Sequence, residues 1–494
     1  MIDRSILSLA EALERGGLTA RRLVRACIDR IEAVDRAGPR LRAVLELNPE
    51  AEAIAVALDE ERARTGSRGP LHGIPVLIKG NIGTADRMTT TAGSLALAGS
   101  IPSRDAFLVE RLRDAGAVLL GKANLSEWAN FRGKNSLSGW SSQGGQTRNP
   151  YAPSRSPCGS SSGSAVAVAA GLCTVAIGTE TDGSIVCPAH VCGVVGIKPT
   201  LGLISRSGII PIAHSQDTAG PMARTVEDAA ILLGVLAGRD PADPATNGAP
   251  KDVDYASSLT FDGLRGARIG VARNFFGHHR GVDRVAEACL DVLRDLGATL
   301  IDPANIETAG AWSDSELTVL IYEFKHGLDA YLAGLGPNAP VNSLADVIAF
   351  NEEHAAEVMQ HFGQELMTIA EAKGPLTEPE YLEALETCQR LARTEGLDAT
   401  LATHRLDAIV APTGRPAWLI DTVHGDYGFG GCSSPAAVAG YPHVTVPAGF
   451  VDGLPIGLSF FGAAWQDAKL IRFAYAFEQA MQARRAPSLL DPPA

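Results

Sequence analysis

The chain has 494 residues, of which 46% are hydrophobic and 20% charged, and its 52 glycines and 29 prolines indicate a folded protein with many turns. Its net charge of −13 argues against a partner bound through phosphate groups, so we expect no nucleic-acid partner. No apolar run approaches the roughly 20 residues that cross a bilayer, and no leader-like segment opens the sequence. We therefore expect no membrane partner and a cytoplasmic protein, although a trimmed exported protein would look the same.

Helical periodicity dominates the N-terminal part of the chain. Apolar residues three and four apart, interrupted by a double glycine, predict two amphipathic helices within 5–35, and a third helix is predicted over 49–65. The pattern changes at 73–79, where GIPVLIK is short, apolar and rich in β-branched residues, which predicts a buried strand. Lys79 stands at the end of that strand.

Residues 109–129 combine helical and strand patterns. The segment predicts a helix, a strand and then a new helix, for which Asn124 and Glu127 have the spacing of a capping pair. A polar loop rich in glycine and serine follows over 133–164 and leads into a helix of small residues over 165–172. This alternation indicates an α/β protein.

The middle of the chain predicts further buried strands. CTVAIG at 173–178 and VVGIKPT at 194–200 are short apolar runs, and the segment TETDGSIVCPAH lies between them. Thr225 and Asp228 form a capping signal for the helix that follows, and GARIGVAR at 266–273 predicts another strand. Strands and helices therefore continue to alternate.

Residues 280–400 are mainly helical in pattern and more charged. Beyond them the sequence predicts three strands and a closing helix, at 406–413, 443–450, 453–462 and 467–484. No internal repeat or low-complexity linker marks a boundary. We therefore expect one large domain over 1–494, with a helical region of about 280–400 packed on an α/β core.

The eight cysteines form no recognisable framework. They are scattered without the dense, even spacing of disulfide-rich domains, which predicts reduced and mostly buried thiols. Cys187, His190 and Cys192 resemble metal ligands in type, but their spacing fits no zinc motif and a second ligand pair is missing. Glycine-rich nucleotide-binding motifs are also absent from the sequence. We therefore expect neither a metal ion nor an organic cofactor.

The first of two serine clusters lies in the polar loop. Gly159-Ser160-Ser161-Ser162-Gly163 matches the G-x-S-x-G elbow of α/β-hydrolases, which would make Ser161 a nucleophile. An elbow needs a buried strand directly before it, whereas the preceding YAPSRSPC is polar and contains two prolines. A plain glycine and serine loop is the preferred interpretation of these residues alone.

The second serine cluster leaves the end of a buried strand. Thr181-Asp182-Gly183-Ser184 forms a turn of small residues, where backbone N–H groups can face a ligand. Each such donor in an oxyanion hole lowers the barrier to acyl transfer by about 3 kcal/mol. An ordinary strand-to-loop turn would account for the same residues, so the spacing alone does not decide.

A reactive serine needs a base, and the sequence offers two kinds. His190 is close to Ser184 along the chain, but no histidine stands in a recognisable triad, and His278-His279 is expected in an exposed loop. Lys79 ends an apolar strand, where desolvation would lower its pKa and let it accept a proton. A strand-end lysine that extends to solvent is the competing interpretation.

Taken together, these segments resemble the amidase signature family. The resemblance extends over most of the chain, through HGIPVLIKGNI at 72–82, GKANLSEW at 121–128, SPCGSSSGSAVAVAAGL at 156–172, AIGTETDGSIVCPA at 176–189, GVVGIKPTLGLISRSGIIPI, DTAGPMARTVEDAA and VPAGFVDGLPIGLSF. Agreement over so many segments in order is highly specific. The resemblance implies the amidase signature fold, a large twisted mixed β-sheet covered on both faces by helices in a single domain.

The same resemblance implies the chemistry of the site. It implies a Ser-cisSer-Lys triad, whose members are Ser184 in TDGSI, Ser160 in CGSSSGS and Lys79 in LIKGN. It implies a cis peptide bond before Ser160 and an amide hydrolase that works through an acyl-enzyme. The implied oxyanion donors are the backbone N–H groups of Thr181, Asp182 and Gly183, with Ser184 as a further candidate.

Two departures from the usual family pattern point to a branch. Asp182 and Val186 stand where many members have glycine and arginine, and the surrounding segments resemble the peptide amidase branch, which removes the C-terminal amide of peptides. The implied partner is therefore a peptide or small amide substrate, with no obligatory protein partner. Three alternatives stay open: the amidase subunit of a glutamine-dependent tRNA amidotransferase, an amidase for small aliphatic or aryl amides, and an inactive amide-binding module.

Overall fold

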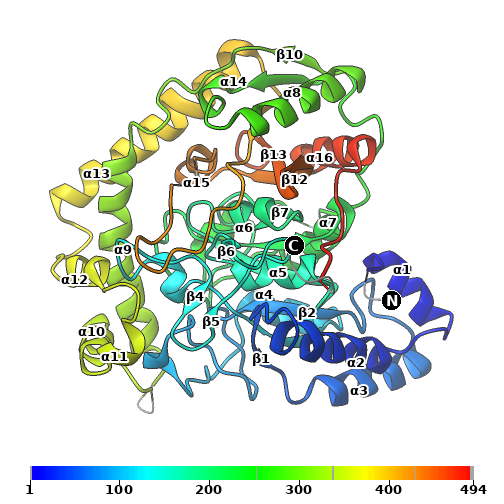
Figure 1. Ribbon diagram of the computed structural model, residues 1–494, viewed down its shortest axis with the longest axis vertical. Helices are drawn as coiled ribbons and strands as arrows, with labels where there is room; N and C mark the ends of the chain where they lie inside the picture. Colours follow the sequence, from blue (N-terminus) through cyan, green and yellow to red (C-terminus); the bar gives the residue numbers. More distant parts are fainter. Residues whose placement is uncertain (1–2, 252, 337–338, 429, 490–494) are drawn as a thin grey trace.

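The computed structural model describes residues 3–251, 253–336, 339–428 and 430–489. Within them eleven strands form one sheet in the order β1-β3-β2-β6-β8-β7-β12-β13-β11-β9-β10 (Figure 1). In chain order these strands are β1 (Val44–Leu47), β2 (Pro75–Lys79), β3 (Val118–Ala123), β6 (Val175–Glu180), β7 (Val195–Lys198), β8 (Thr218–Ala223), β9 (Arg268–Val271), β10 (Thr299–Ile301), β11 (Ala408–Pro412), β12 (His443–Val451) and β13 (Leu454–Phe461). A separate small ribbon pairs β4 (Trp140–Ser141) with β5 (Gly145–Gln146).

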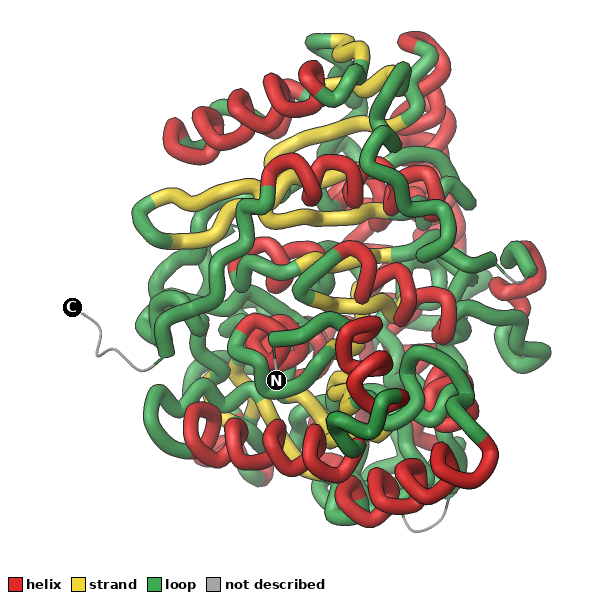
Figure 2. Tube along the Cα trace, turned by 90° about the vertical axis from the view of Figure 1, so that its right-hand side faces the viewer, coloured by secondary structure: helices red, strands yellow, loops and turns green. Residues whose placement is uncertain are grey.

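Helices lie on both sides of the strands, as Figure 2 shows in red and yellow. In chain order they are α1 (Ile6–Glu14), α2 (Ala20–Arg30), α3 (Ala51–Thr65), α4 (Phe107–Asp114), α5 (Ser162–Ala169), α6 (Val186–Val191), α7 (Val226–Leu236), α8 (Arg280–Asp295), α9 (Ser313–Ala333), α10 (Leu344–Glu353), α11 (Ala355–Val358), α12 (Glu365–Glu371), α13 (Pro379–Gln389), α14 (Asp398–His404), α15 (Ser434–Ala439) and α16 (Asp467–Met481). Two π-helical segments, η1 (Ile31–Arg36) and η6 (Arg390–Leu397), continue α2 and α13.

The sheet is parallel in two places and antiparallel elsewhere. β2 runs parallel to β3 and β6, and β9 runs parallel to β10 and β11. β2, β6 and β11 are buried at every position, as expected for strands covered by helices on both faces. The expected large mixed sheet with helices on both faces is thereby confirmed.

Long periodic segments formed as predicted, whereas four short elements were not predicted. Helix α7 begins at the expected cap, where the Thr225 hydroxyl accepts a hydrogen bond from the Asp228 N–H at 3.2 Å. Strands β1, β8 and β10 and helix α6 are not among the predicted elements. Each of them is short and lacks the continuous apolar run that marked the equally short β2.

The helical region forms one side of the molecule. Helices α9 to α13 lie along one edge in Figure 1, in green to yellow, and α9 packs against α12 and α13. The range 280–400 also contains β10, which is one of the two terminal strands of the sheet. Tyr322 of α9 shares an apolar cluster with Ile409 of β11 and Phe461 of β13. A single domain over 1–494 requires such a shared core, and the domain assignment itself stays a prediction.

The helix expected after Asn124 is absent. Residues Glu127–Asn130 form a short 3-10 turn instead, and Trp128 and Ala129 have left-handed backbone conformations with φ of 50° and 55°. The Asn124 amide donates to Arg42 and to the segment 145–147, and the Glu127 carboxylate forms a buried ion pair with Arg132 at 2.6 Å. Long-range partners therefore override the capping pattern that the spacing suggested.

The expectation of reduced cysteines is wrong for one pair. Cys158 and Cys187 form a disulfide with their Cα atoms 6.0 Å apart, while the other six cysteines are buried and free. The two residues are separated by 29 positions in the sequence. Only the packing of α6 against the loop before α5 brings them together, so their scattered spacing carried no signal.

The structure bears in part on where the protein resides. Among the described helices, none is both long enough and apolar enough to cross a bilayer. The cytoplasmic location stays a prediction, and the disulfide does not favour it because such bonds are rare in cytosolic proteins.

Candidate active site

Parallel pairing brings two strand ends together at one edge of the sheet. Ile78 of β2 lies opposite Ile177 of β6, so the carboxyl ends of both strands are neighbours. Lys79 ends β2, and its Nζ donates to Thr179 of β6, to Oγ1 at 2.8 Å and to the carbonyl oxygen at 3.1 Å. Lys79 is completely buried, which excludes a strand-end lysine that extends to solvent.

Lys79 is also bonded to the first serine cluster. Its Nζ donates to Ser160 Oγ at 2.7 Å. Burial lowers the pKa of Lys79 to about 7, although the negative charges of Asp217 and Glu180 oppose this effect. A lysine with such a pKa can accept a proton near neutral pH, as a general base must.

Ser160 occupies a tight turn directly before α5. The Gly159–Ser160 peptide bond is cis, in agreement with the resemblance, and Ser160 is completely buried. The Ser160 carbonyl oxygen accepts a hydrogen bond from the Ser126 N–H at 3.1 Å. A Cβ on Gly159 would overlap Ser126 Oγ, so only glycine fits at this close approach.

Ser184 lies in the turn between β6 and α6. It keeps 8% of its surface exposed, whereas Ser160 is completely buried. Gly183 has a φ of 78°, in the left-handed region that favours glycine. The Ser161 N–H donates to the Ser184 carbonyl oxygen at 3.1 Å, which joins the two serine segments.

Two buried carboxyl groups hold this turn from either end. Glu180 Oε2 accepts hydrogen bonds from the N–H groups of Ile185 at 2.6 Å and Val186 at 3.0 Å. The Thr181 hydroxyl donates to Asp217 Oδ1 at 2.6 Å. The positions of the backbone N–H groups around Ser184 are therefore fixed by the surrounding side chains.

Ser161 does not have the environment of a nucleophile. It is completely buried at the start of α5, and no buried strand precedes it. Its Oγ donates to the Thr179 carbonyl oxygen at 2.9 Å and accepts from the Thr179 N–H at 3.1 Å. Ser161 therefore links α5 to β6, which agrees with the preferred interpretation of a plain glycine and serine loop.

The CPAHVC residues have partners within the protein. Cys187 is in the disulfide, and the His190 ring accepts from the Gly457 N–H at 2.7 Å and lies 2.9 Å from the Arg415 carbonyl oxygen. Burial lowers the pKa of His190 to about 4, so the ring is neutral at physiological pH. These contacts make His190 a structural residue of α6.

Two cavities reach the site. The larger, of about 660 Å³, is lined by Cys158, Gly159, Asp182, Gly183 and Cys187, together with residues of α9, α15 and the loop before α15. The smaller, of about 260 Å³, is lined by residues that include Asn81, Ser160, Thr179, Thr181 and Arg206. Residues 181–183 therefore lie between two cavities that small molecules can enter.

An acidic pair forms part of the wall of the larger cavity. Asp182 Oδ2 accepts a hydrogen bond from the Ser434 hydroxyl at 2.5 Å, and Glu316 of α9 lies within hydrogen-bonding reach of Asp182. Burial raises the pKa of both carboxyl groups, that of Glu316 to about 8. Burial and their mutual repulsion therefore disfavour ionisation of both carboxyl groups together, which favours a pair that shares one proton.

Sequence reasoning missed several residues that support the lysine. Asn81 Nδ2 donates to Thr179 Oγ1 at 3.0 Å, and Thr179 in turn bonds to Lys79. Asp217 holds the Thr181 hydroxyl from the segment before β8. Asn81 is only two residues after Lys79, which was a usable signal, whereas Asp217 is brought in by the fold alone.

Comparison with known families defines the class of this protein. The family model described as Amidase matches residues 22–471. The chain therefore belongs to the amidase family and is an amide hydrolase.

Three individual proteins are similar to this chain over nearly its full length. The native peptide amidase of Stenotrophomonas maltophilia is 55% identical, with a TM-score of 0.95 over 99% of each chain. A protein of Arabidopsis thaliana named a probable amidase is 43% identical over 99% of this chain and 92% of its own. A glutamyl-tRNA(Gln) amidotransferase subunit of Chloroflexus aurantiacus is 37% identical over 96% of each chain. The chain is thus similar to peptide amidases and, less closely, to amidotransferase subunits.

Proposed function

We propose that this protein converts the C-terminal amide of peptides to the free acid and ammonia, through an acyl-enzyme on Ser184. The observation that carries the proposal is the hydrogen bond of 2.7 Å between Ser160 and the buried Lys79. It supplies a base without a histidine, and the Ser161 N–H donates to the Ser184 carbonyl oxygen at 3.1 Å, which holds the two serine segments together. The similarity to the peptide amidase of Stenotrophomonas maltophilia supports the choice of substrate.

The proton moves along a relay of three side chains. Neutral Lys79 accepts the proton of the Ser160 hydroxyl, while Ser160 accepts that of Ser184. The Ser184 oxygen then attacks the amide carbon, and the backbone N–H groups of Thr181, Asp182 and Gly183 stabilise the oxyanion.

The same relay in reverse completes each half of the reaction. The proton held by Lys79 returns through Ser160 to the departing nitrogen, which leaves as ammonia, and the acyl group stays as an ester on Ser184. Water is then deprotonated by the same relay and cleaves the ester. The net reaction consumes one water and yields a carboxylic acid and ammonia.

The charge of the larger cavity favours a peptide amide over free glutamine. Its wall carries the carboxyl groups of Asp182, Glu316 and Asp426, and none of its described lining residues is Lys, Arg or His. Arg206 of the smaller cavity is already held by the Asp243 carboxylate. The α-carboxylate of free glutamine would therefore meet the partly protonated Asp182–Glu316 pair and no cation, whereas the backbone of an amidated peptide carries no negative charge.

Mass spectrometry on mixed substrates tests the proposal. The enzyme is incubated with amidated dipeptides, free glutamine, a small aliphatic amide and an aryl amide, and amide-to-acid conversion is measured for each. We expect conversion at the peptide C-termini only, with internal peptide bonds intact. Conversion of glutamine alone would favour an amidotransferase component, and conversion of simple amides alone would favour a general amidase.

A Ser184→Ala variant and a covalent probe provide the control. A serine-reactive fluorophosphonate should label the wild-type protein at Ser184 and leave the variant unlabelled. An unlabelled wild-type protein that also converts none of the substrates would favour an amide-binding module and refute the proposal.

A further inference from the structure

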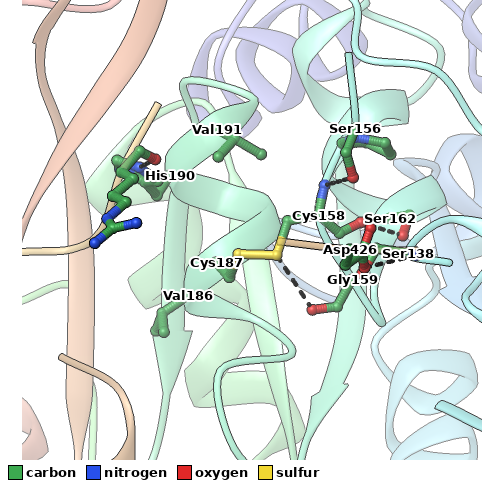
Figure 3. The surroundings of a disulfide bond; sticks show 12 residues. Ser138, Ser156, Cys158, Gly159, Ser162, Val186, Cys187, His190, Val191 and Asp426 are labelled. Carbon is green, nitrogen blue, oxygen red and sulfur yellow. Dashed lines mark hydrogen bonds between the residues drawn. A yellow bond between two sulfur atoms is a disulfide. The ribbon is translucent and has the colours of Figure 1, made fainter. Parts of the chain in front are cut away.

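The disulfide lies between the two segments that carry the proposed serines. Cys158 is two residues before Ser160, and Cys187 is three residues after Ser184, in the first turn of α6. Figure 3 shows the bond crossing from α6 to the turn that holds Gly159. A covalent link therefore spans the gap across which the proton relay must operate.

Each end of the disulfide is anchored to the segment on which it lies. The Cys158 N–H donates to Ser156 Oγ at 3.1 Å, and the Cys158 carbonyl oxygen accepts from Ser162 Oγ at 2.5 Å (Figure 3). The Cys187 N–H donates to the Gly183 carbonyl oxygen at 2.8 Å. A displacement of either sulfur atom would therefore shift the adjacent turn, which carries Ser160 on one side and Ser184 on the other.

Hydrogen bonds also join these segments, and each of them is weaker than the covalent bond. The Ser161 N–H bonds to the Ser184 carbonyl oxygen at 3.1 Å, and the Ser161 hydroxyl bonds to Thr179. These contacts would keep the segments together without the disulfide. Loss of the covalent bond should therefore loosen the relative position of the serines rather than unfold the site.

The disulfide also faces the space that a substrate would occupy. Cys158 and Cys187 both line the larger cavity, next to Gly159 and Gly183, and keep 5% and 2% of their surfaces exposed. A small dithiol entering the cavity can therefore approach the bond.

We propose that Cys158 and Cys187 are positioning residues, whose disulfide holds Ser160 at the relay distance from Ser184 and makes turnover depend on the oxidation state of this bond. The inference rests on the proposed function. Reduction by a dithiol breaks the S–S bond and forms two thiols, while the reductant gives up two electrons and two protons and closes to its own cyclic disulfide.

Reduction of the wild-type enzyme is the first test. Thiols are counted after unfolding with and without prior dithiothreitol treatment, and kcat and KM are measured on an amidated dipeptide. We expect six thiols before reduction and eight after it. The kcat should fall between about 10-fold and 100-fold on reduction, because a misplacement of the order of an ångström disrupts proton transfer. The KM should change by less than about twofold, because the cavity walls persist, and reoxidation should restore kcat.

Cysteine variants distinguish a positioning role of this disulfide from a general effect of the reductant on the other cysteines. The double variant Cys158→Ala/Cys187→Ala should show the lowered kcat without reductant and no further response to it. Cys192→Ala is the matched control, because Cys192 directly follows α6, is buried and forms no disulfide. It should keep the wild-type kcat and the wild-type response to dithiothreitol.

The outcomes distinguish this inference from the proposed function. Eight thiols in the untreated enzyme, or an unchanged kcat in the reduced wild type and the folded double variant, would overturn the positioning role while leaving peptide deamidation intact. If the double variant does not fold, the kcat of the reduced wild-type enzyme alone tests the positioning role. The rate of fluorophosphonate labelling at Ser184 should fall with kcat, which gives a readout that does not depend on the substrate.

Discussion

Replacing Lys79 with methionine should abolish activity and, at neutral pH, relieve a cost to the stability of the fold. Methionine fills a similar volume but has neither charge nor a basic nitrogen. Because general-base catalysis contributes about 10²-fold to 10⁴-fold, kcat/KM should fall by at least that factor. The wild-type enzyme should lose kcat/KM as the pH falls through about 7, where Lys79 becomes protonated.

The cost to stability follows from the pKa of Lys79. An exposed lysine has a pKa of 10.5, whereas burial lowers that of Lys79 to about 7. Between these two pH values the unfolded chain binds one more proton than the folded chain, so wild-type stability rises with pH through this window. At pH 7 the burial costs about 4 kcal/mol, and the cost disappears as the pH approaches 10.5.

Urea unfolding of both proteins, monitored by fluorescence from pH 7 to 10, measures this effect. Methionine leaves Ser160 and Thr179 without the Lys79 hydrogen bonds, a penalty of about 1–3 kcal/mol that does not vary over this range. The stability of the variant relative to the wild type should therefore decline steadily as pH rises. Other titrating groups are present in both proteins and cancel in the difference.

Lys122→Met is the matched control for this experiment. Lys122 is also buried, with its pKa lowered to about 7, but it donates to the Ile82 carbonyl oxygen and Thr90 Oγ1, away from both serines. Its replacement should reproduce the pH-dependent stability effect and keep most of the activity. A stability difference for Lys79→Met that does not vary with pH, or substantial activity in that variant at neutral pH, would refute a neutral catalytic lysine.

Three further substitutions have defined outcomes. Ser184→Ala should lower kcat by at least about 10³-fold with an unchanged circular dichroism spectrum, and a smaller loss would argue against Ser184 as the nucleophile. Gly183→Ala should lower kcat about 10-fold in steady-state assays, because its φ of 78° is unfavourable for alanine and the added Cβ would lie 3.1 Å from Ser433 Oγ. Glu127→Gln should destabilise the protein by about 3 kcal/mol in urea unfolding, since it leaves the completely buried Arg132 without its counter-charge, and unchanged stability would contradict this account.

The agreement between sequence and structure is best where the signal is local. Helix α7 and strand β2 lie where periodicity and caps predicted them, because burial of one helix face or of a whole strand constrains consecutive residues. The helix predicted after Asn124 failed for the opposite reason. Its capping residues bond to distant loops and to Arg132, and these contacts do not appear in the local pattern.

Only part of the chemistry of the candidate site could be predicted from the sequence. The residue types and motifs of Lys79, Ser160 and Ser184 singled them out, but neither the low pKa nor the Lys79–Ser160 hydrogen bond follows from spacing. Both depend on the parallel pairing of β2 with β6, which buries the lysine and brings it to the serine turn.

The sequence by itself determined the family, the α/β character and the residues of the proposed relay, since these follow from motifs of consecutive residues and from short-range periodicity. Only the tertiary structure joined Cys158 to Cys187 and set Glu316 beside Asp182. These pairings link segments far apart in the chain and depend on the order in which eleven strands assemble. Burial, charge and contact at the site are properties of that assembly, so no single segment encodes them.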